Sequence, residues 1–243
     1  MKAKNHSRNK NSKTALLSEA SPFAVKEAYK HICMNMMFSI NSSGEPSKVF
    51  AITSSVAGEG KSTTAANLAL SFASMGKNVL LIDADMRRSA QQKLWGFPES
   101  NGLSNLLSGV GECKIHGISA LPISIIGSGD TPPNPSELLS ASLFPKMIAR
   151  LKKSYDYILI DTPPINLVSD TQIILKQADG IVMVVSSGTT DKRDLNYAMK
   201  LIAHSNAKCC GFILNKINPK HTDYGYSYSR SYGYDYDYDY DYA

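Results

Sequence analysis

The fold of this chain is decided by the stretch 49–63, which reads VFAITSSVAGEGKST. Its first five residues are apolar or β-branched, as in a buried strand, and good helix formers follow from residue 65 to residue 72. A strand, a glycine-containing loop that ends in Gly60-Lys61-Ser62 and a helix together form the motif called the P-loop. In such a loop, backbone N–H groups and the positive end of the helix bind phosphate. The sequence therefore predicts a nucleotide-binding protein.

Each position of this loop has an expected role. Gly58 and Gly60 allow the backbone to turn and to present its N–H groups. Lys61 is expected to reach the β- and γ-phosphates, and the Ser62 hydroxyl is expected to bind Mg²⁺. The first glycine of the usual motif is replaced by Ser55, and a glycine turn that binds no nucleotide is the alternative interpretation. The loop residues predicted to contact the nucleotide are Ser55, Gly58, Glu59, Gly60, Lys61, Ser62 and Thr63.

Aspartates follow two further apolar runs of the chain. The run at 80–82 leads into Asp83 and then Asp85, and the run at 158–160 leads into Asp161. Because ligands bind beyond the carboxyl ends of the strands in an open parallel sheet, we expect all three carboxylates beside the phosphates. They can hold Mg²⁺, directly or through water, and leave one carboxylate to accept a proton. For any one of them, a helix cap or a turn is the alternative.

Apolar runs alternate with helical patterns along most of the chain, which predicts an α/β fold. We expect a P-loop NTPase-like, doubly wound, mostly parallel sheet with helices on both faces. Ser21 is expected to cap the first helix, with Pro22 as its first residue. The expected strands span residues 49–53, 79–83, 123–126, 157–161, 181–185 and 209–214, and the expected helices span residues 23–38, 61–75, 135–153, 169–178 and 190–204.

The composition is that of an ordinary globular protein. The chain has 243 residues, a mass of 26.5 kDa and 43% hydrophobic residues, enough for a sizeable core. The longest apolar run, 181–185, has the length of a strand, and no apolar region follows the basic N-terminus. We therefore expect neither a membrane span nor export. The four cysteines lack metal-site spacing and are expected to be reduced.

The two ends of the chain differ from the middle. We expect a basic, disordered arm at 1–20, a P-loop domain at 21–218 and a tail at 219–243. Residues 1–13 contain five basic residues and no acidic one, so contact with anionic lipid or nucleic acid is the alternative to a solvated arm. The tail tyrosines are Tyr224, Tyr226, Tyr228, Tyr232, Tyr234, Tyr236, Tyr238, Tyr240 and Tyr242.

The composition of this tail predicts disorder. It has no aliphatic side chain between residues 224 and 242, and four aspartates alternate with tyrosines from residue 235 to residue 241. An edge strand with tyrosines on one face is the structural alternative. Stacking on single-stranded nucleic acid is disfavoured because the tail is acidic, so no nucleic-acid partner is expected.

Together these motifs resemble the bacterial protein-tyrosine kinases of capsular and exopolysaccharide synthesis, in the form with a separate cytosolic kinase subunit. The resemblance covers about residues 21–243 and includes the tyrosine tail. Its motifs are SVAGEGKST at 55–63, LIDADMR at 81–87, PPNPSELL at 132–139 and IDTPP at 160–164.

The resemblance implies an ATP-dependent kinase that phosphorylates tyrosines, including those of its own tail and in trans. Lys61 and Ser62 then belong to nucleotide and Mg²⁺, Asp83 takes the tyrosine proton, Asp85 supports the metal, and Asp161 binds it through water. Asn215 is expected near the adenine. The implied partners are a membrane-embedded chain-length regulator that activates the kinase and a cognate tyrosine phosphatase. The implied location is the cytoplasm, at the inner face of the membrane.

One motif of the family is altered here. The first helix usually carries Glu-x-x-Arg-x-x-Arg, which joins subunits, whereas this chain has Glu27, Lys30 and Cys33. Lysine keeps the charge but loses the bidentate geometry of arginine, and cysteine keeps neither. Glu27 and Lys30 are therefore predicted oligomer contacts in a weakened motif, and Cys33 is also compatible with a core position.

Two other functions share much of this pattern. A partition-type P-loop ATPase would act as an ATP-dependent dimerisation switch, but such proteins carry a lysine where this chain has Val56, and they lack a tyrosine-rich tail. A nucleotide-dependent scaffold with low turnover would use the tail to recruit partners. The intact set of Lys61, Asp83 and Asp161 disfavours the scaffold.

Overall fold

The computed structural model describes residues 16–40, 48–98, 101–205 and 208–217. The predictions for the tyrosine tail, and for residues 1–15 of the basic arm, lie outside the described residues. Within the described ranges, no helix has the length and apolar character that crossing a membrane requires.

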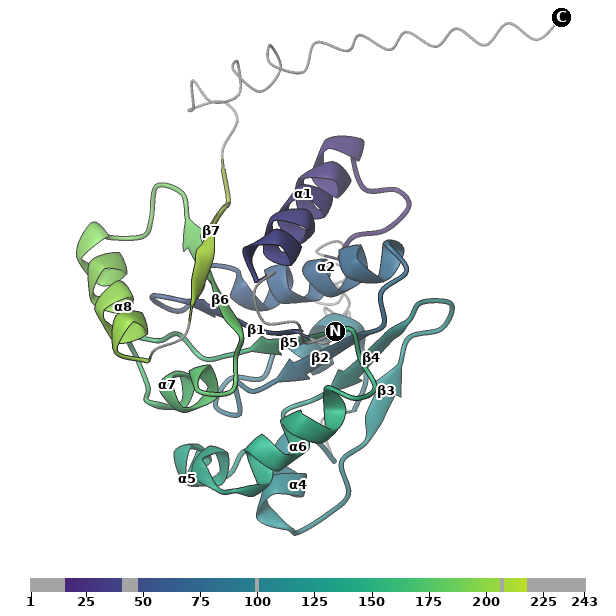
Figure 1. The fold of residues 1–243 in the computed structure, drawn as a ribbon, viewed down its shortest axis with the longest axis vertical. Helices are drawn as coiled ribbons and strands as arrows, with labels where there is room; N and C mark the ends of the chain where they lie inside the picture. Colours follow the sequence, from purple (N-terminus) through teal and green to yellow (C-terminus); the bar gives the residue numbers. More distant parts are fainter. Residues whose placement is uncertain (1–15, 41–47, 99–100, 206–207, 218–243) are drawn as a thin grey trace, which may run out of the picture.

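The centre of the fold is a seven-stranded sheet with the order β3-β4-β2-β5-β1-β6-β7 (Figure 1). All neighbouring strands are parallel except β3 and β4, which pair antiparallel at the edge. The predicted α/β fold class is therefore confirmed. The strands are β1 (Lys48–Ser54), β2 (Val79–Asp83), β3 (Ile115–Gly117), β4 (Ile123–Ile126), β5 (Tyr157–Asp161), β6 (Gly180–Ser186) and β7 (Cys209–Asn215).

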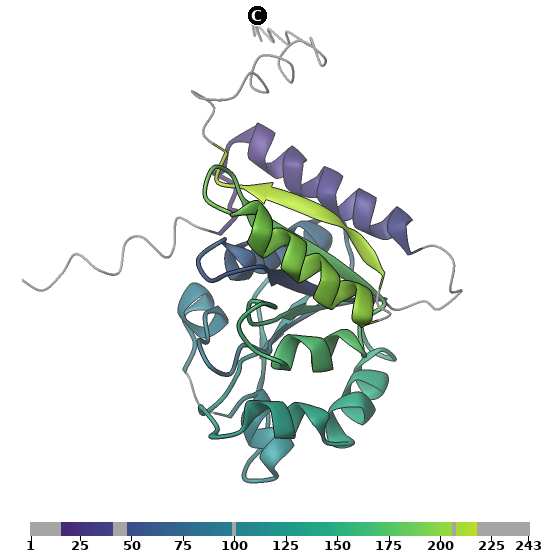
Figure 2. The ribbon, with the colours of Figure 1, turned by 90° about the vertical axis from the view of Figure 1, so that its left-hand side faces the viewer.

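Helices cover both faces of the sheet (Figures 1 and 2). One face packs against α1 and α2 through a core that includes Phe50, Phe72 and Leu159. The other face packs against α4 to α8, in clusters that include Phe144 and Ala198. The helices are α1 (Phe23–Ser39), α2 (Lys61–Ser74), α3 (Gln91–Trp95), α4 (Leu103–Ser108), α5 (Pro135–Ser140), α6 (Leu143–Leu151), α7 (Asp170–Leu175) and α8 (Lys192–His204).

Helix α2 follows the P-loop and is held rigidly between α1 and the sheet. Ten of its fourteen residues are buried. The ring of Phe72 stacks on that of Tyr157 in β5 with 4.3 Å between their centroids. Cys33 of α1 is also fully buried in this layer, as one of the two interpretations of that residue predicted. Since the helix is fixed along its length, its N-terminus is fixed relative to β1, β2 and β5.

Three details differ from the sequence prediction. The expected helix 135–153 is two helices, because a continuous helix would bring the ring of Pro145 against the carbonyl of Ala141, which is extended here (φ −65°, ψ 148°). Pro22, and not Ser21, is the N-cap of α1, and the Ser21 hydroxyl accepts the N–H of Ser18 instead. The short elements α3, α4 and β3 were not predicted: α3 and α4 are shorter than two helical turns, and β3 lacks the apolar run that marks the other short strands.

Candidate nucleotide-binding and catalytic site

The sheet brings the predicted carboxylates to one edge. Strands β2 and β5 are parallel neighbours in which Asp83 pairs with Asp161, so both aspartates lie at the same level. Strand β1 lies on the other side of β5, with Ile52 opposite Asp161, and continues into the P-loop. The register of three parallel strands therefore places two acids and the phosphate-binding loop side by side.

The backbone of the P-loop depends on its glycines. Gly60 is the N-cap of α2 and has a φ of +95°, in the left-handed region that favours glycine. A Cβ added to Gly60 would lie 2.1 Å from Nδ2 of Asn215, which is closer than any atom can approach. Gly58 also has a positive φ, of +84°, but an added Cβ there would meet nothing within 4 Å.

Glu59 shapes the inside of the loop. Its carboxylate is 2% exposed and accepts hydrogen bonds from the Ser55 hydroxyl and the Val56 N–H, both at 2.9 Å. The Thr190 hydroxyl, from the segment between β6 and α8, also donates to it. Ser55, which replaces the first glycine of the usual motif, is thus engaged with Glu59. The structure places both side chains within the loop, outside the set of residues that line the neighbouring cavity.

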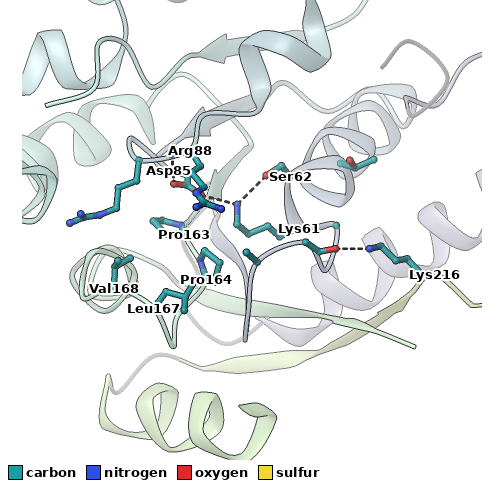
Figure 3. Close-up of a pocket in the computed structure, with 14 residues that line it drawn as sticks. Lys61, Ser62, Asp85, Arg88, Pro163, Pro164, Leu167, Val168 and Lys216 are labelled. Atoms are coloured by element: carbon teal, nitrogen blue, oxygen red, sulfur yellow. Dashed lines mark hydrogen bonds and ion pairs between the residues drawn. The ribbon is translucent and has the colours of Figure 1, made fainter. Parts of the chain in front are cut away.

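Lys61 lies among the predicted carboxylates. Its Nζ is 3.1 Å from Asp85 Oδ2 and 3.1 Å from the Ser62 hydroxyl (Figure 3). It also lies 3.5 Å from Asp161 Oδ1. Burial alone would lower the pKa of Lys61, but the charges of Asp161 and Asp85 outweigh it and raise the pKa. The ammonium group is therefore charged and held between the two carboxylates and the Ser62 hydroxyl.

Asp83 is enclosed more tightly than Asp85. It is fully buried, and its Oδ2 accepts the backbone N–H groups of Ala90 and Gln91 at 3.0 Å. Burial and the neighbouring charge of Asp161 raise the pKa of Asp83 to about 7, against the opposing effect of these hydrogen bonds. Asp85 lines the cavity, whereas Asp83 lies behind it.

Gln91 is a site residue that the sequence analysis missed. Its Nε2 donates to Asp161 Oδ2 at 2.8 Å and to the Ser62 carbonyl at 2.9 Å. Its Oε1 accepts the indole N–H of Trp95 at 3.0 Å. Gln91 thus fixes one oxygen of Asp161 and ties it to the start of α2. No motif marks this glutamine, because it begins the five-residue helix α3.

The oxygen atoms of this group fit a magnesium ion. Asp161 Oδ1 is buried and accepts no hydrogen bond, so one carboxylate oxygen remains available. It lies next to Asp85 and the Ser62 hydroxyl around Lys61. Among the described residues no group of three or more His, Cys, Asp or Glu side chains could hold a metal alone. Mg²⁺ is typically held by one or two carboxylates together with substrate phosphates and water, and Asp85 and Asp161 could supply those carboxylates.

A cavity of about 590 Å³ opens beside this cluster (Figure 3). The P-loop forms one side of it, through Ala57, Gly58 and residues 60–63, together with Asp85. The opposite side is apolar and comes from the segment after β5. The cations and apolar residues of the lining are Arg87, Arg88, Lys216, Pro163, Pro164, Leu167 and Val168.

Arg87 is held in place by a buried acid. Its Nε lies 2.7 Å from Asp170 Oδ2 and its Nη2 lies 3.2 Å from Asp170 Oδ1, while the Ser136 hydroxyl donates to the same carboxylate. Burial alone would raise the pKa of Asp170, but the bonds from Arg87 and Ser136 lower it below the usual value. The ion pair joins the segment after β2 to α7. The hydrogen bond from Ser136 adds α5, so the proline-rich segment at 132–139 contributes one of the groups that hold Asp170.

Two further residues lie at the outer end of the loop. Asn215 Nδ2 donates to the Glu59 carbonyl at 2.9 Å, and Lys216 Nζ donates to the Gly58 carbonyl at 2.6 Å. Asn215 was expected near the adenine, and the structure places its amide against the backbone of the P-loop.

The predicted oligomer contacts lie on α1, apart from this cluster. Lys30 Nζ is 2.7 Å from Glu27 Oε1 within the same helix. Both residues line a second cavity of about 450 Å³, which also contains Phe23, Ser71 and Leu121.

Comparison with known proteins gives a consistent result. A protein-family profile described as the AAA domain matches residues 47–208. The tyrosine-protein kinase CpsD of Streptococcus agalactiae is 40% identical over 203 residues, which is 82% of this chain and 87% of that protein.

Solved structures show the same similarity. The chimerical protein CapA2B2 superposes with a TM-score of 0.76 and 35% identity, over 82% of this chain and 86% of that one. The kinase domain of the Escherichia coli tyrosine kinase ETK superposes with a TM-score of 0.75 and 27% identity, over 79% and 75% of the two chains.

Proposed function

This chain belongs to the bacterial tyrosine-protein kinases, and on that basis we propose that it transfers the γ-phosphoryl group of ATP to tyrosines of its own C-terminal segment. The proposed acceptors are the nine tyrosines between residues 224 and 242. The observation that carries the proposal is Lys61, which lies 3.1 Å from Asp85 and 3.5 Å from Asp161 at the rim of a cavity bounded by the P-loop.

The P-loop supports the nucleotide part of the proposal. Its backbone is preformed, because two hydrogen bonds within the loop hold the Glu59 carboxylate and the Asn215 amide holds the Glu59 carbonyl from β7. A preformed loop can bind phosphate without first becoming ordered, and the N-terminus of α2 adds its positive end. Lys61 would neutralise negative charge on the β- and γ-phosphates as it develops during transfer.

The carboxylates are proposed to divide into two roles. Ser62, Asp85 and Asp161 would hold Mg²⁺, and the bound metal would neutralise phosphate charge. Asp83, which is fully buried behind the cavity in this structure, would have to come within hydrogen-bond reach of the phenol to accept its proton as the tyrosine oxygen bonds to the γ-phosphorus and ADP departs with its bridging oxygen. Its raised pKa, about 7, suits a proton acceptor near neutral pH, since a carboxylate of ordinary pKa is a weaker base.

The biological setting is proposed from the family resemblance. We propose that the chain acts in the cytoplasm on capsular or exopolysaccharide synthesis, that a membrane-embedded chain-length regulator activates it at the inner face of the membrane, and that a tyrosine phosphatase reverses it. Phosphorylation between molecules is proposed over phosphorylation within one, with Glu27 and Lys30 of α1 as a subunit contact. Lys30 already pairs with Glu27 in its own helix. It also lacks the bidentate geometry of arginine, so we expect it to bind a neighbouring subunit more weakly than arginine would.

Phosphosite mapping after incubation with Mg-ATP tests the function directly. The full chain is incubated alone and with the cytosolic segment of the adjacent membrane regulator, beside a Lys61→Met control. Phosphate on tail tyrosines that the control abolishes is the expected result. ATP hydrolysis with no protein phosphorylation would instead support the partition-type ATPase.

The direction of transfer needs a second experiment. A full-length Lys61→Met chain is mixed with unaltered chain that carries a mass tag, so that the two tails can be distinguished. Phosphate on the tail of the inactive variant is expected for transfer between molecules. Phosphate restricted to the active molecule would show transfer within one chain.

A further inference from the structure

The apolar side of the main cavity has no part in the chemistry described so far. It is formed by Pro163, Pro164, Leu167 and Val168, which follow Asp161 along the chain (Figure 3). Of these residues, Leu167 is 60% exposed and Val168 is half-buried, whereas Pro163 and Pro164 are buried and reach the cavity with a small part of their surface. Phosphates would bind on the other side, at the P-loop. The apolar side is thus suited to a different part of the substrates, such as an aromatic ring.

Two arginines lie beside this apolar side. The guanidinium group of Arg87 is occupied by the buried carboxylate of Asp170. Arg88 also lines the cavity and is exposed, and within the described part of the chain no hydrogen bond or ion pair engages its guanidinium group. Only its backbone N–H is bonded, to Asp85. The backbone of Arg88 is therefore held by Asp85, while its guanidinium group is available to bind an anion beside the apolar side of the cavity.

We propose that this half of the cavity is the acceptor subsite, and that Arg88 selects tyrosines flanked by aspartate. The tyrosine ring would pack on Leu167 and Val168, and a neighbouring carboxylate would pair with Arg88. This inference rests on the proposed kinase function and adds a preference among acceptors. The occupant is the Tyr-Asp repeat at residues 234–242 of this chain, presented by a second copy.

The sequence of the tail supplies the complementary groups. In residues 234–242 every second position is tyrosine and every position between is aspartate. In residues 225–229, by contrast, Tyr226 and Tyr228 are flanked only by glycine and serine. The subsite would bind a tyrosine ring and a neighbouring carboxylate together. The Tyr-Asp repeat offers both groups, so it should be a better substrate than Tyr226 and Tyr228, which offer only the ring. The same arginine would have no partner beside Tyr226 or Tyr228.

The two halves of the tail give an internal ratio for the test. Phosphate on Tyr236, Tyr238 and Tyr240 is measured relative to phosphate on Tyr226 and Tyr228 at early times. The unaltered chain should favour the Tyr-Asp repeat. Arg88→Ala should lower this ratio roughly three- to tenfold, as expected for loss of a partly exposed charge pair. Arg88→Lys should retain part of the preference, and added salt should weaken it.

Two further variants separate selection from general effects. Arg150→Ala removes an exposed arginine on α6 that does not line the cavity, and should leave the ratio unchanged. A chain with asparagine at positions 235, 237, 239 and 241 should lose the preference and become insensitive to Arg88→Ala. If Arg88→Ala changes the ratio only in the chain that keeps its tail aspartates, the effect of Arg88 depends on the tail carboxylates.

The outcomes distinguish the inference from the function it rests on. An unchanged ratio in Arg88→Ala, with the tail still phosphorylated, overturns the acceptor subsite and leaves the kinase intact. An equal loss at all tail tyrosines also overturns it, because Arg88 would then act on the nucleotide or the chemistry. Absence of phosphate from the tail of the unaltered chain, even with the membrane regulator's cytosolic segment, contradicts the proposed function itself.

Discussion

The amide of Asn215 lies where a side chain on Gly60 would have to be: a Cβ built on Gly60 would approach Asn215 Nδ2 to 2.1 Å. The same amide donates to the carbonyl of Glu59, the residue before. Strand β7 therefore supports the phosphate-binding loop from outside, while Glu59 supports it from inside. The loop can hold its shape only while position 60 carries no side chain.

The first prediction concerns this contact. Gly60→Ala should weaken nucleotide binding and destabilise the fold by about 1–3 kcal/mol, because it combines a strained φ with a clash. Gly58→Ala is the matched control, since it has a similar φ but open space, and its cost should be smaller. Denaturant unfolding and nucleotide titration measure both. Adding Asn215→Ala to Gly60→Ala should recover part of the loss, and no recovery would refute the clash.

The second prediction concerns Lys61. Lys61→Met should reduce tyrosine phosphorylation at least about 10²- to 10³-fold, because it removes a positive charge placed to meet developing phosphate charge. It also leaves Asp85 and Asp161 uncompensated, so the variant should be less stable without Mg²⁺ than with it. Thermal melts with and without the metal measure this difference. Lys153→Met, an exposed change outside the cavity, is the control.

The third prediction separates the two aspartates at the end of β2. Asp83→Asn should lower the rate of transfer by about 10²- to 10⁴-fold with little change in nucleotide affinity, as expected for loss of a proton acceptor. Asp85→Asn should in addition weaken Mg-ATP binding, because Asp85 contacts Lys61 and lines the cavity. Single-turnover rates and nucleotide titration provide the measurement. A full transfer rate in Asp83→Asn would remove Asp83 from the chemistry.

The fourth prediction uses the pH dependence of Asp170. Its pKa is lowered in the folded state, so its stabilising contribution is present above the unfolded pKa of about 3.8 and is lost as the pH falls through the folded value. Asp170→Asn should cost about 2 kcal/mol near neutral pH, less than for a fully buried pair because Arg87 is 42% exposed. The difference from the unaltered chain should shrink below pH 4. A constant difference across that range would contradict the assignment.

Much of the site could be predicted from the sequence because it depends on local order along the chain. The apolar runs before Asp83 and Asp161 predict strands, and parallel strands bring the residues at their carboxyl ends to one edge of the sheet. The P-loop motif likewise predicts that β1 leads into α2 at Lys61. Pairing of β2 with β5 then brings Asp85 and Asp161 to 3.1 Å and 3.5 Å from the Lys61 ammonium group.

The parts that could not be predicted depend on contacts between distant positions. Arg87 and Asp170 meet across 83 positions, and neither residue type indicates the other. Gln91 bonds Asp161 from a helix too short to show a hydrophobic period. One of the hydrogen bonds to the inward-facing Glu59 carboxylate comes from Thr190, which follows β6 and lies 131 positions away in the chain. Pro145 did carry a local signal, and it divides the expected helix.

Asn215 and Lys216 are also the root of the C-terminal segment, which continues from Ile217 into the tyrosines. These two residues hold the Glu59 and Gly58 carbonyls through one hydrogen bond each. The segment that carries the proposed acceptor tyrosines is therefore continuous with two residues that help to hold the nucleotide-binding loop in shape.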